Sequence, residues 1–201
     1  MAYSHAVTAP GFDEPVLQAQ QVFRALLTAQ SQPGRIVKVD SVATLPPLYP
    51  ATMALLLTLV DRDTPLWLDL SPSPWEAVSS HLRFHCGCPI VTAPFDAAFA
   101  VLSRPEKMPD FSAFSLGSDE CPDRSTTLII QVETLLEHRG RRWAGPGIAD
   151  ARRVHVAELP EHFWRQWRNN HALFPRGVDV IFTQADHLLA LPRSVHVAED
   201  N

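Results

Sequence analysis

The sequence predicts an α/β fold in which a mixed sheet carries helices on both faces. Helical and strand-like patterns alternate in the first half of the chain, and strand-like patterns cluster in the second half. One continuous β-branched segment, TTLIIQV at 126–132, is typical of a central buried strand. No linker or internal repeat divides the 201 residues, so we expect a single domain over 1–201, with 1–10 as a flexible N-terminus.

Four segments have the pattern of helices. Apolar residues recur at near-helical spacing over 14–30, with a proline in the first turn and a Pro-Gly pair after the last. Residues 51–60 are apolar almost all round, which predicts a buried helix. Residues 74–84 and the tryptophan-rich segment 161–170 complete the set.

The predicted strands are short and separated by turn residues. We expect 135–143 to return antiparallel to 126–132, and Gly145-Pro146-Gly147 to form a turn after it. The remaining strands are predicted at 35–39, 66–70, 89–92, 99–102, 153–156, 177–182, 188–191 and 195–197.

Composition excludes several classes of protein. The chain has 17 basic and 22 acidic residues, a net charge of −5, so we do not expect binding to nucleic acid as its main function. The longest apolar stretch, 51–60, is far short of the roughly 20 residues that span a bilayer, and we expect no membrane contact. The first ten residues lack the pattern of a signal peptide, and we expect a cytoplasmic protein.

A cluster of potential metal ligands lies near the end of the third predicted helix. His81, His85, Cys86 and Cys88 fall within eight residues, but one residue separates the cysteines where structural zinc sites favour two, and no second pair follows. We therefore predict no metal site, and interpret these residues as helix-end histidines with semi-buried thiols.

Two loops are candidate anion sites. Arg124 and Ser125 precede the central strand and could hold an oxyanion at a sheet end, where α/β proteins place ligands. The alternative is a polar loop in which Arg124 pairs with Asp123 or Glu120.

The second loop is the turn containing Gly145 and Gly147. Successive glycine amides can form an anion nest, and nearby arginines would add charge. The alternative, which we favour, is a tight turn with arginines on a solvated face. The arginines are Arg141, Arg142, Arg152 and Arg153.

The last predicted helix carries Trp164 and Trp167. They fit core packing or an interface with a partner equally well, since tryptophan is enriched at binding hot spots. The chain has no Gly-x-Ser-x-Gly segment and no Cys-His signature, so we assign no catalytic residue.

An ordered set of segments extends over nearly the whole chain. They are 11–16 (GFDEPV), 19–20 (AQ), 23–24 (FR), 32–34 (QPG), 59–68 (LVDRDTPLWL), 82–85 (LRFH), 116–118 (LGS), 145–148 (GPGI), 174–179 (FPRGVD) and 191–194 (LPRS). No single segment is decisive, but together they resemble the PhnH family, which belongs to the bacterial carbon–phosphorus lyase system.

The resemblance implies a component of a multi-subunit core complex with partner subunits G, I, J and K. It implies a supporting role in the step that replaces the adenine of ATP with a phosphonate, giving ribose 1-phosphonate 5-triphosphate. It also implies a fold like the large domain of pyridoxal-phosphate-dependent transferases but without the cofactor, and a homodimer when isolated. The only lysines, Lys38 and Lys107, lie in a short strand and a Pro-rich loop, which are poor places for a Schiff base.

Three functions therefore compete. The leading one is a structural or assembly subunit without an active site of its own. The second is a subunit that contributes contacts to nucleotide or phosphonate oxyanions near Arg124 or the Gly145–Gly147 turn. The third is a stand-alone pyridoxal-phosphate or metal enzyme, which would be purified with bound cofactor or metal.

Overall fold

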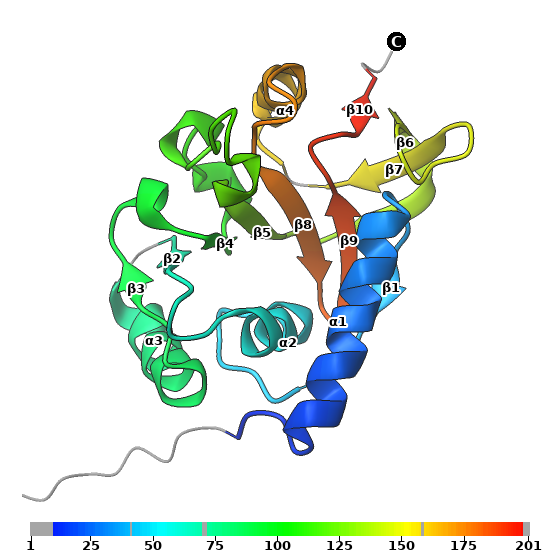
Figure 1. The fold of residues 1–201 in the computed structure, drawn as a ribbon. Helices are drawn as coiled ribbons and strands as arrows, with labels where there is room; N and C mark the ends of the chain where they lie inside the picture. The colour runs from blue at the N-terminus through cyan, green and yellow to red at the C-terminus, as the bar shows by residue number, and fades with distance from the viewer. Residues whose placement is uncertain (1–9, 41, 70–71, 158, 199–201) are drawn as a thin grey trace, which may run out of the picture.

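The computed structural model describes residues 10–40, 42–69, 72–157 and 159–198, and all but the last residue of the predicted flexible stretch 1–10 lies outside them. Within these residues the chain forms four α-helices and two sheets (Figure 1). Each helix overlaps a segment that the sequence predicts. The helices are α1 Pro15–Ser31, α2 Pro50–Leu59, α3 Pro72–Cys86 and α4 Phe163–Ala172, with 3-10 turns at Pro94–Asp96, Pro105–Lys107, Phe111–Ala113 and Pro122–Arg124.

The larger sheet is mixed, as predicted, and has seven strands in the described residues, in the order β1-β9-β8-β5-β4-β2-β3. Strands β3, β2, β4, β5 and β8 run parallel, and β9 is antiparallel to both of its neighbours. The strands are β1 Val37–Lys38, β2 Leu66–Leu68, β3 Ile90–Val91, β4 Phe99–Leu102, β5 Thr127–Gln131, β8 Asp179–Gln184 and β9 His187–Leu191.

Strand β5 is the centre of this sheet, which confirms the strongest strand prediction. Leu128, Ile129 and Ile130 are fully buried. Ile129 packs into the core on one face of the sheet, and its two neighbours pack into the core on the other. A strand buried on both faces needs the continuous apolar run that the sequence supplies.

A separate sheet is formed by β6 Leu135–Ala144, β7 Arg152–Val156 and β10 His196–Val197, in the order β10-β6-β7. The prediction that residues 135–143 pair with the central strand is therefore wrong. Both edges of β5 are already occupied by the parallel strands β4 and β8. Strand β6 pairs instead with β7 and β10, both antiparallel.

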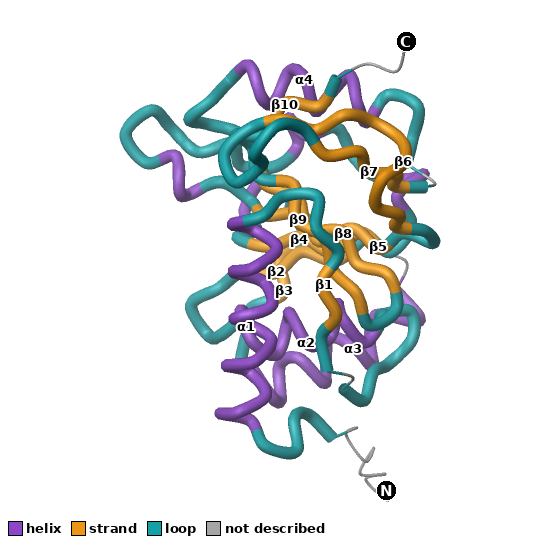
Figure 2. Tube along the Cα trace, turned by 90° about the vertical axis from the view of Figure 1, so that its right-hand side faces the viewer, coloured by secondary structure: helices purple, strands orange, loops and turns teal. Residues whose placement is uncertain are grey.

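The larger sheet has helices on both faces, as predicted (Figures 1 and 2). Helices α1, α2 and α3 cover one face and share a core with Ile129. Helix α4 and the smaller sheet cover the other, where Phe163 and Trp167 pack with Trp143. The smaller sheet thus takes a place in the layer that the sequence pattern assigned to helices alone.

Candidate functional site

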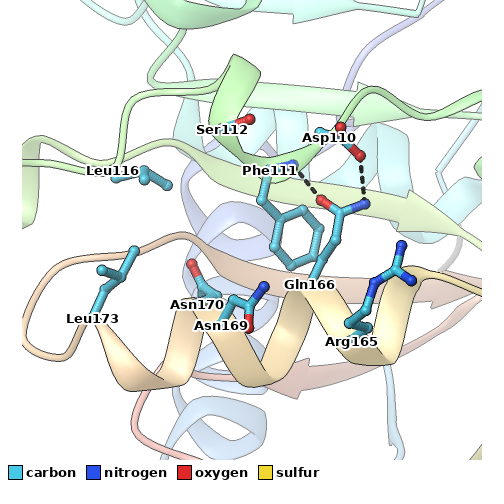
Figure 3. Close-up of a pocket in the computed structure, with 9 residues that line it drawn as sticks. All are labelled: Asp110, Phe111, Ser112, Leu116, Arg165, Gln166, Asn169, Asn170 and Leu173. Carbon is cyan, nitrogen blue, oxygen red and sulfur yellow. Dashed lines mark hydrogen bonds between the residues drawn. The ribbon is translucent and has the colours of Figure 1, made fainter.

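A hollow of about 310 Å³ lies between α4 and the segment that connects β4 to β5 (Figure 3). Gln166 reaches across one end of it: its side-chain oxygen accepts from the backbone N–H of Phe111 at 2.6 Å, and its amide nitrogen donates to Asp110 at 2.8 Å. The lining residues are Asp110, Phe111, Ser112, Leu116, Arg165, Gln166, Asn169, Asn170 and Leu173.

Hydrogen bonds to the backbone of Val178 fix the α4 side of this hollow. Asn170 is buried, and its side chain both accepts from Val178 N–H at 2.8 Å and donates to Val178 C=O at 2.9 Å. The groups that face solvent are the guanidinium of Arg165 and the amide of Asn169, with the carboxylate of Asp110 opposite. Such an array of donors and acceptors suits contact with polar backbone or side chains of another protein.

The two tryptophans of α4 occupy different environments. Trp167 is fully buried and donates its indole N–H to the carbonyl of Val195 at 3.0 Å. Trp164 is half-buried, with the guanidinium of Arg141 5.2 Å from its ring centre. Of the two residues predicted at an interface, Trp164 therefore has surface to offer a partner, and Trp167 holds the core.

Arg124 and Ser125 lie where β5 begins, at the amino ends of the parallel strands. Ser125 is buried, and its hydroxyl accepts a hydrogen bond from the guanidinium of Arg193. Arg124 is exposed, its carbonyl accepts from Ser115 Oγ at 2.8 Å, and among the described residues no ion pair joins it to Asp123 or Glu120. Ligands in open α/β sheets bind at the carboxyl ends of strands, so the position of this loop does not favour an oxyanion site.

Arg193 organises this amino edge, a role that no motif in the sequence indicates. Its guanidinium pairs with Asp179 at the start of β8, with Nε 3.1 and 3.2 Å from the two carboxylate oxygens. It also donates to the carbonyls of Pro122 at 2.8 Å and Pro175 at 3.3 Å. The only sequence signal is that both partners lie in segments, 174–179 and 191–194, that carry the family resemblance.

At the opposite, carboxyl edge, Asp69 follows β2. Burial raises the pKa of its carboxyl, although three hydrogen bonds oppose this shift. They come from the backbone N–H groups of Ser103 and Arg104 and from the hydroxyl of Ser103, at 2.8 to 3.0 Å. A neighbouring hollow of about 350 Å³ is lined by Tyr49, Ser103, Arg104, Pro105, Glu106, Gln131, Val132 and Glu133.

The glycine turn is confirmed as a turn after β6. Gly147 has φ +81°, and a Cβ there would lie 2.1 Å from the carbonyl oxygen of Ser31 at the end of α1. Gly145 is similarly confined, since a Cβ added at this position would lie 3.0 Å from the carbonyl oxygen of Ser194. Close backbone approach explains both glycines, and anion binding at this turn stays a prediction.

The histidines and cysteines at the end of α3 differ in burial: His81 and Cys88 are buried, Cys86 is half-buried and His85 is exposed. The His81 and His85 rings are 4.3 Å apart, and among the described residues no group of three or more His, Cys, Asp or Glu could hold a metal ion. Burial raises the pKa of Cys86 to about 12 and also raises that of Cys88. These thiols therefore remain protonated at neutral pH.

Both lysines lie on the surface of the protein. The ammonium of Lys38 lies 3.2 Å from the carboxylate of Asp186, and Lys107 is exposed in a 3-10 turn. None of the described helices has both the length and the hydropathy to cross a membrane.

Comparison with known proteins identifies relatives over almost the full length of the chain. One is alpha-D-ribose 1-methylphosphonate 5-triphosphate synthase subunit PhnH of Rhizobium meliloti, 37% identical over 190 residues that cover 94% of each chain. Another is the putative C-P lyase subunit protein HtxG of Stutzerimonas stutzeri, 32% identical over 89% of this chain and 85% of the relative. The family model described as bacterial phosphonate metabolism protein (PhnH) matches residues 10–198, and the chain therefore belongs to the PhnH family.

Proposed function

We propose that this protein is an assembly subunit of the carbon–phosphorus lyase core complex. In this role it supports formation of ribose 1-phosphonate 5-triphosphate from ATP and a phosphonate, without an active site of its own. The observation that carries the proposal is the relative named as a subunit of ribose 1-methylphosphonate 5-triphosphate synthase, which matches 94% of this chain.

The partners we propose are subunits G, I, J and K, in the cytoplasm, with a homodimer when the protein is isolated. A fold like the large domain of pyridoxal-phosphate-dependent transferases, without the cofactor, is supported by the five parallel strands of the mixed sheet and by the exposed positions of the two lysines. The interface we favour is the surface where α4 meets β6 and β7, at which half-buried Trp164 lies under Arg141, because Trp and Arg dominate binding hot spots.

Co-expression tests the assembly role. The tagged chain should recover subunits G, I, J and K in stoichiometric amounts through gel filtration. Trp164→Ala should reduce recovery, and Phe84→Ala, which removes an aromatic ring 73% exposed on α3, should not. If the partners assemble with one another and the tagged chain elutes alone, the assembly role fails.

A second candidate function is that the subunit contributes contacts to an oxyanion near the Gly145–Gly147 turn. The observation that favours it is a hollow beside this turn lined by Arg142, Arg152 and Arg153. The Arg124 loop has less support, because Arg193 already engages the hydroxyl of Ser125 and the carbonyl of Pro122. Binding of phosphorylated compounds to the isolated protein tests this function.

A further inference from the structure

The outer face of the β6–β7 hairpin has a concentration of positive charge that is unusual for this chain. A hollow of about 500 Å³, here called the arginine hollow, is lined by His138, Arg142, Ala151, Arg152 and Arg153. No carboxylate is among these lining residues, although the chain as a whole has a net charge of −5. The local field therefore opposes that of the whole molecule and would attract an anion.

The register of the two strands brings like charges together. Arg142 of β6 is directly opposite Arg153 of β7, and both side chains are exposed. Like charges at directly opposed positions destabilise an antiparallel pair. The arrangement is thus unfavourable for the free protein and becomes favourable when an anion lies between the two guanidinium groups.

Backbone carbonyls position two of the arginines. Arg152 donates to the carbonyls of Gln32 and Pro33 just after α1, each at 3.1 Å, and Arg153 donates to the carbonyl of Gly140 at 3.1 Å. Arg152 lies on the inward face of β7 with buried Val154 and Val156, whereas Arg153 uses one terminal nitrogen in its bond and keeps other guanidinium N–H groups for a ligand. Fixed, forked donors of this kind match the oxygens of phosphate groups.

An irregularity in the hairpin shapes the remaining wall. The pairing of β6 with β7 shifts between Glu137 and Arg141. His138 in this bulge has a positive φ of 64°, rare for a residue with a side chain, and its ring is 90% exposed. Bulges of this kind redirect a side chain, and here the redirected residue is His138 at the edge of the arginine hollow.

We infer that the arginine hollow binds the triphosphate group of a small molecule. Arg142 and Arg153, opposite each other on neighbouring strands, place two guanidinium groups on the outer face, and each can contact a different phosphate of a polyphosphate chain. The inference rests on the second candidate function and names its residues and ligand class. It does not require that the same surface hold a partner subunit.

Calorimetric titration of the full chain with sodium tripolyphosphate tests the inference. Tripolyphosphate should bind more tightly than pyrophosphate, and pyrophosphate more tightly than phosphate, with affinities that fall as salt is added. Arg142→Gln and Arg153→Gln should each weaken tripolyphosphate binding about tenfold, as expected for loss of a charged hydrogen bond. Arg62→Gln is the matched control, because Arg62 is an exposed arginine in the turn before β2, paired with Asp63.

Three results would overturn the inference: no tripolyphosphate binding, equal loss of binding in Arg62→Gln, or tighter binding of a single-stranded oligonucleotide than of tripolyphosphate. A folding defect is separable, since Arg142→Gln relieves repulsion and should raise the unliganded melting temperature. Co-expression of Arg142→Gln with the partner subunits separates this inference from the assembly role, because a variant that assembles normally yet does not bind tripolyphosphate supports both.

Discussion

At the scale of single residues, His81 is an unusual feature of the core. It is 1% exposed, and neither ring nitrogen has a hydrogen-bond partner among the described residues. Burial, followed by the neighbouring charge of His85, lowers the pKa of His81. An uncharged, unpartnered imidazole in an apolar site costs free energy that an aliphatic side chain of similar size would not.

We therefore expect His81→Leu to stabilise the protein by about 1 kcal/mol at neutral pH. The unfolded chain takes up a proton near the ordinary histidine pKa and the folded chain only at lower pH. The stability of the wild type is thus intact above the unfolded pKa and is lost as pH falls toward the folded one. As pH is lowered from about 7.5 to 5.5, the urea concentration at the midpoint of unfolding should therefore fall less in His81→Leu than in the wild type. His155→Gln, on the exposed face of β7, is the control, and a similarly flattened profile there would contradict this assignment.

The thiols of Cys86, the last residue of α3, and of Cys88 just after it give a second residue-scale prediction. Because burial raises the pKa of Cys86 to about 12, almost no thiolate forms near pH 8, and Cys88 is 1% exposed. Iodoacetamide should therefore leave both unmodified in the native protein and alkylate all three cysteines in urea. Mass spectrometry of the digested protein identifies the alkylated cysteines. If Cys86 were alkylated in the native protein as fast as in urea, the end of α3 would have to open in the native state.

At the scale of elements, Arg193 ties the starts of β5 and β8 to the segment after β9. The side chains of Arg193 and Asp179 are only 13% and 22% exposed. Removing one partner of a buried ion pair leaves the other charge uncompensated, so Arg193→Leu should cost about 3–5 kcal/mol of unfolding free energy. Arg176→Leu is the matched control. Arg176 Nε lies 3.0 Å from a carboxylate oxygen of Asp119, whose side chain is 85% exposed, so the loss of unfolding free energy should stay below about 1 kcal/mol. Equal losses of unfolding free energy in the two variants, measured by urea denaturation, would show that the Arg193–Asp179 pair stabilises the fold no more than an exposed ion pair does.

The Gly145–Gly147 turn fixes the small sheet against the end of α1. Gly147→Ala combines a left-handed backbone with a Cβ 2.1 Å from a backbone oxygen, so we expect a cost well above the roughly 1–2 kcal/mol of left-handed conformation alone. Gly87→Ala separates the two effects, because Gly87 has φ +70° and its nearest contact would be 3.8 Å away. Thermal unfolding should show the larger loss for Gly147→Ala, and the same loss in both variants would mean that strain alone matters.

The helices and strands were easier to predict from the sequence than the pairing between strands. The apolar run of β5 and the periodicity of α1 are local signals, and both elements occur close to the predicted bounds. The partner of β6 depends on which edges of β5 are free, and this is decided by β8, about fifty residues further along the chain. The same limit applied to Arg124 and Ser125: the sequence placed them at a sheet end, but only the parallel pairing of β5 shows which end.

At the scale of the whole molecule, one sheet divides two cores. Ile129 belongs to the core shared with α1, α2 and α3, and its neighbour Leu128 belongs to the core shared with α4 and the small sheet. Both are fully buried in β5, so each core rests on the same central strand. A domain built this way should unfold as one cooperative unit, because neither layer keeps its apolar face buried without the sheet.

Two variants test this single-domain prediction. Ile129→Ala and Leu128→Ala should each lower the free energy of unfolding by about 2–4 kcal/mol, since each deletes buried methyl groups from a different core. In urea, circular dichroism and tryptophan fluorescence should report one coincident transition whose midpoint moves with either variant and whose slope does not change. If the layers were independent, two transitions would appear and each variant would shift only one. Coincident shifts in both variants would mean that the helical layer and the layer of α4 and the small sheet fold as one unit through β5.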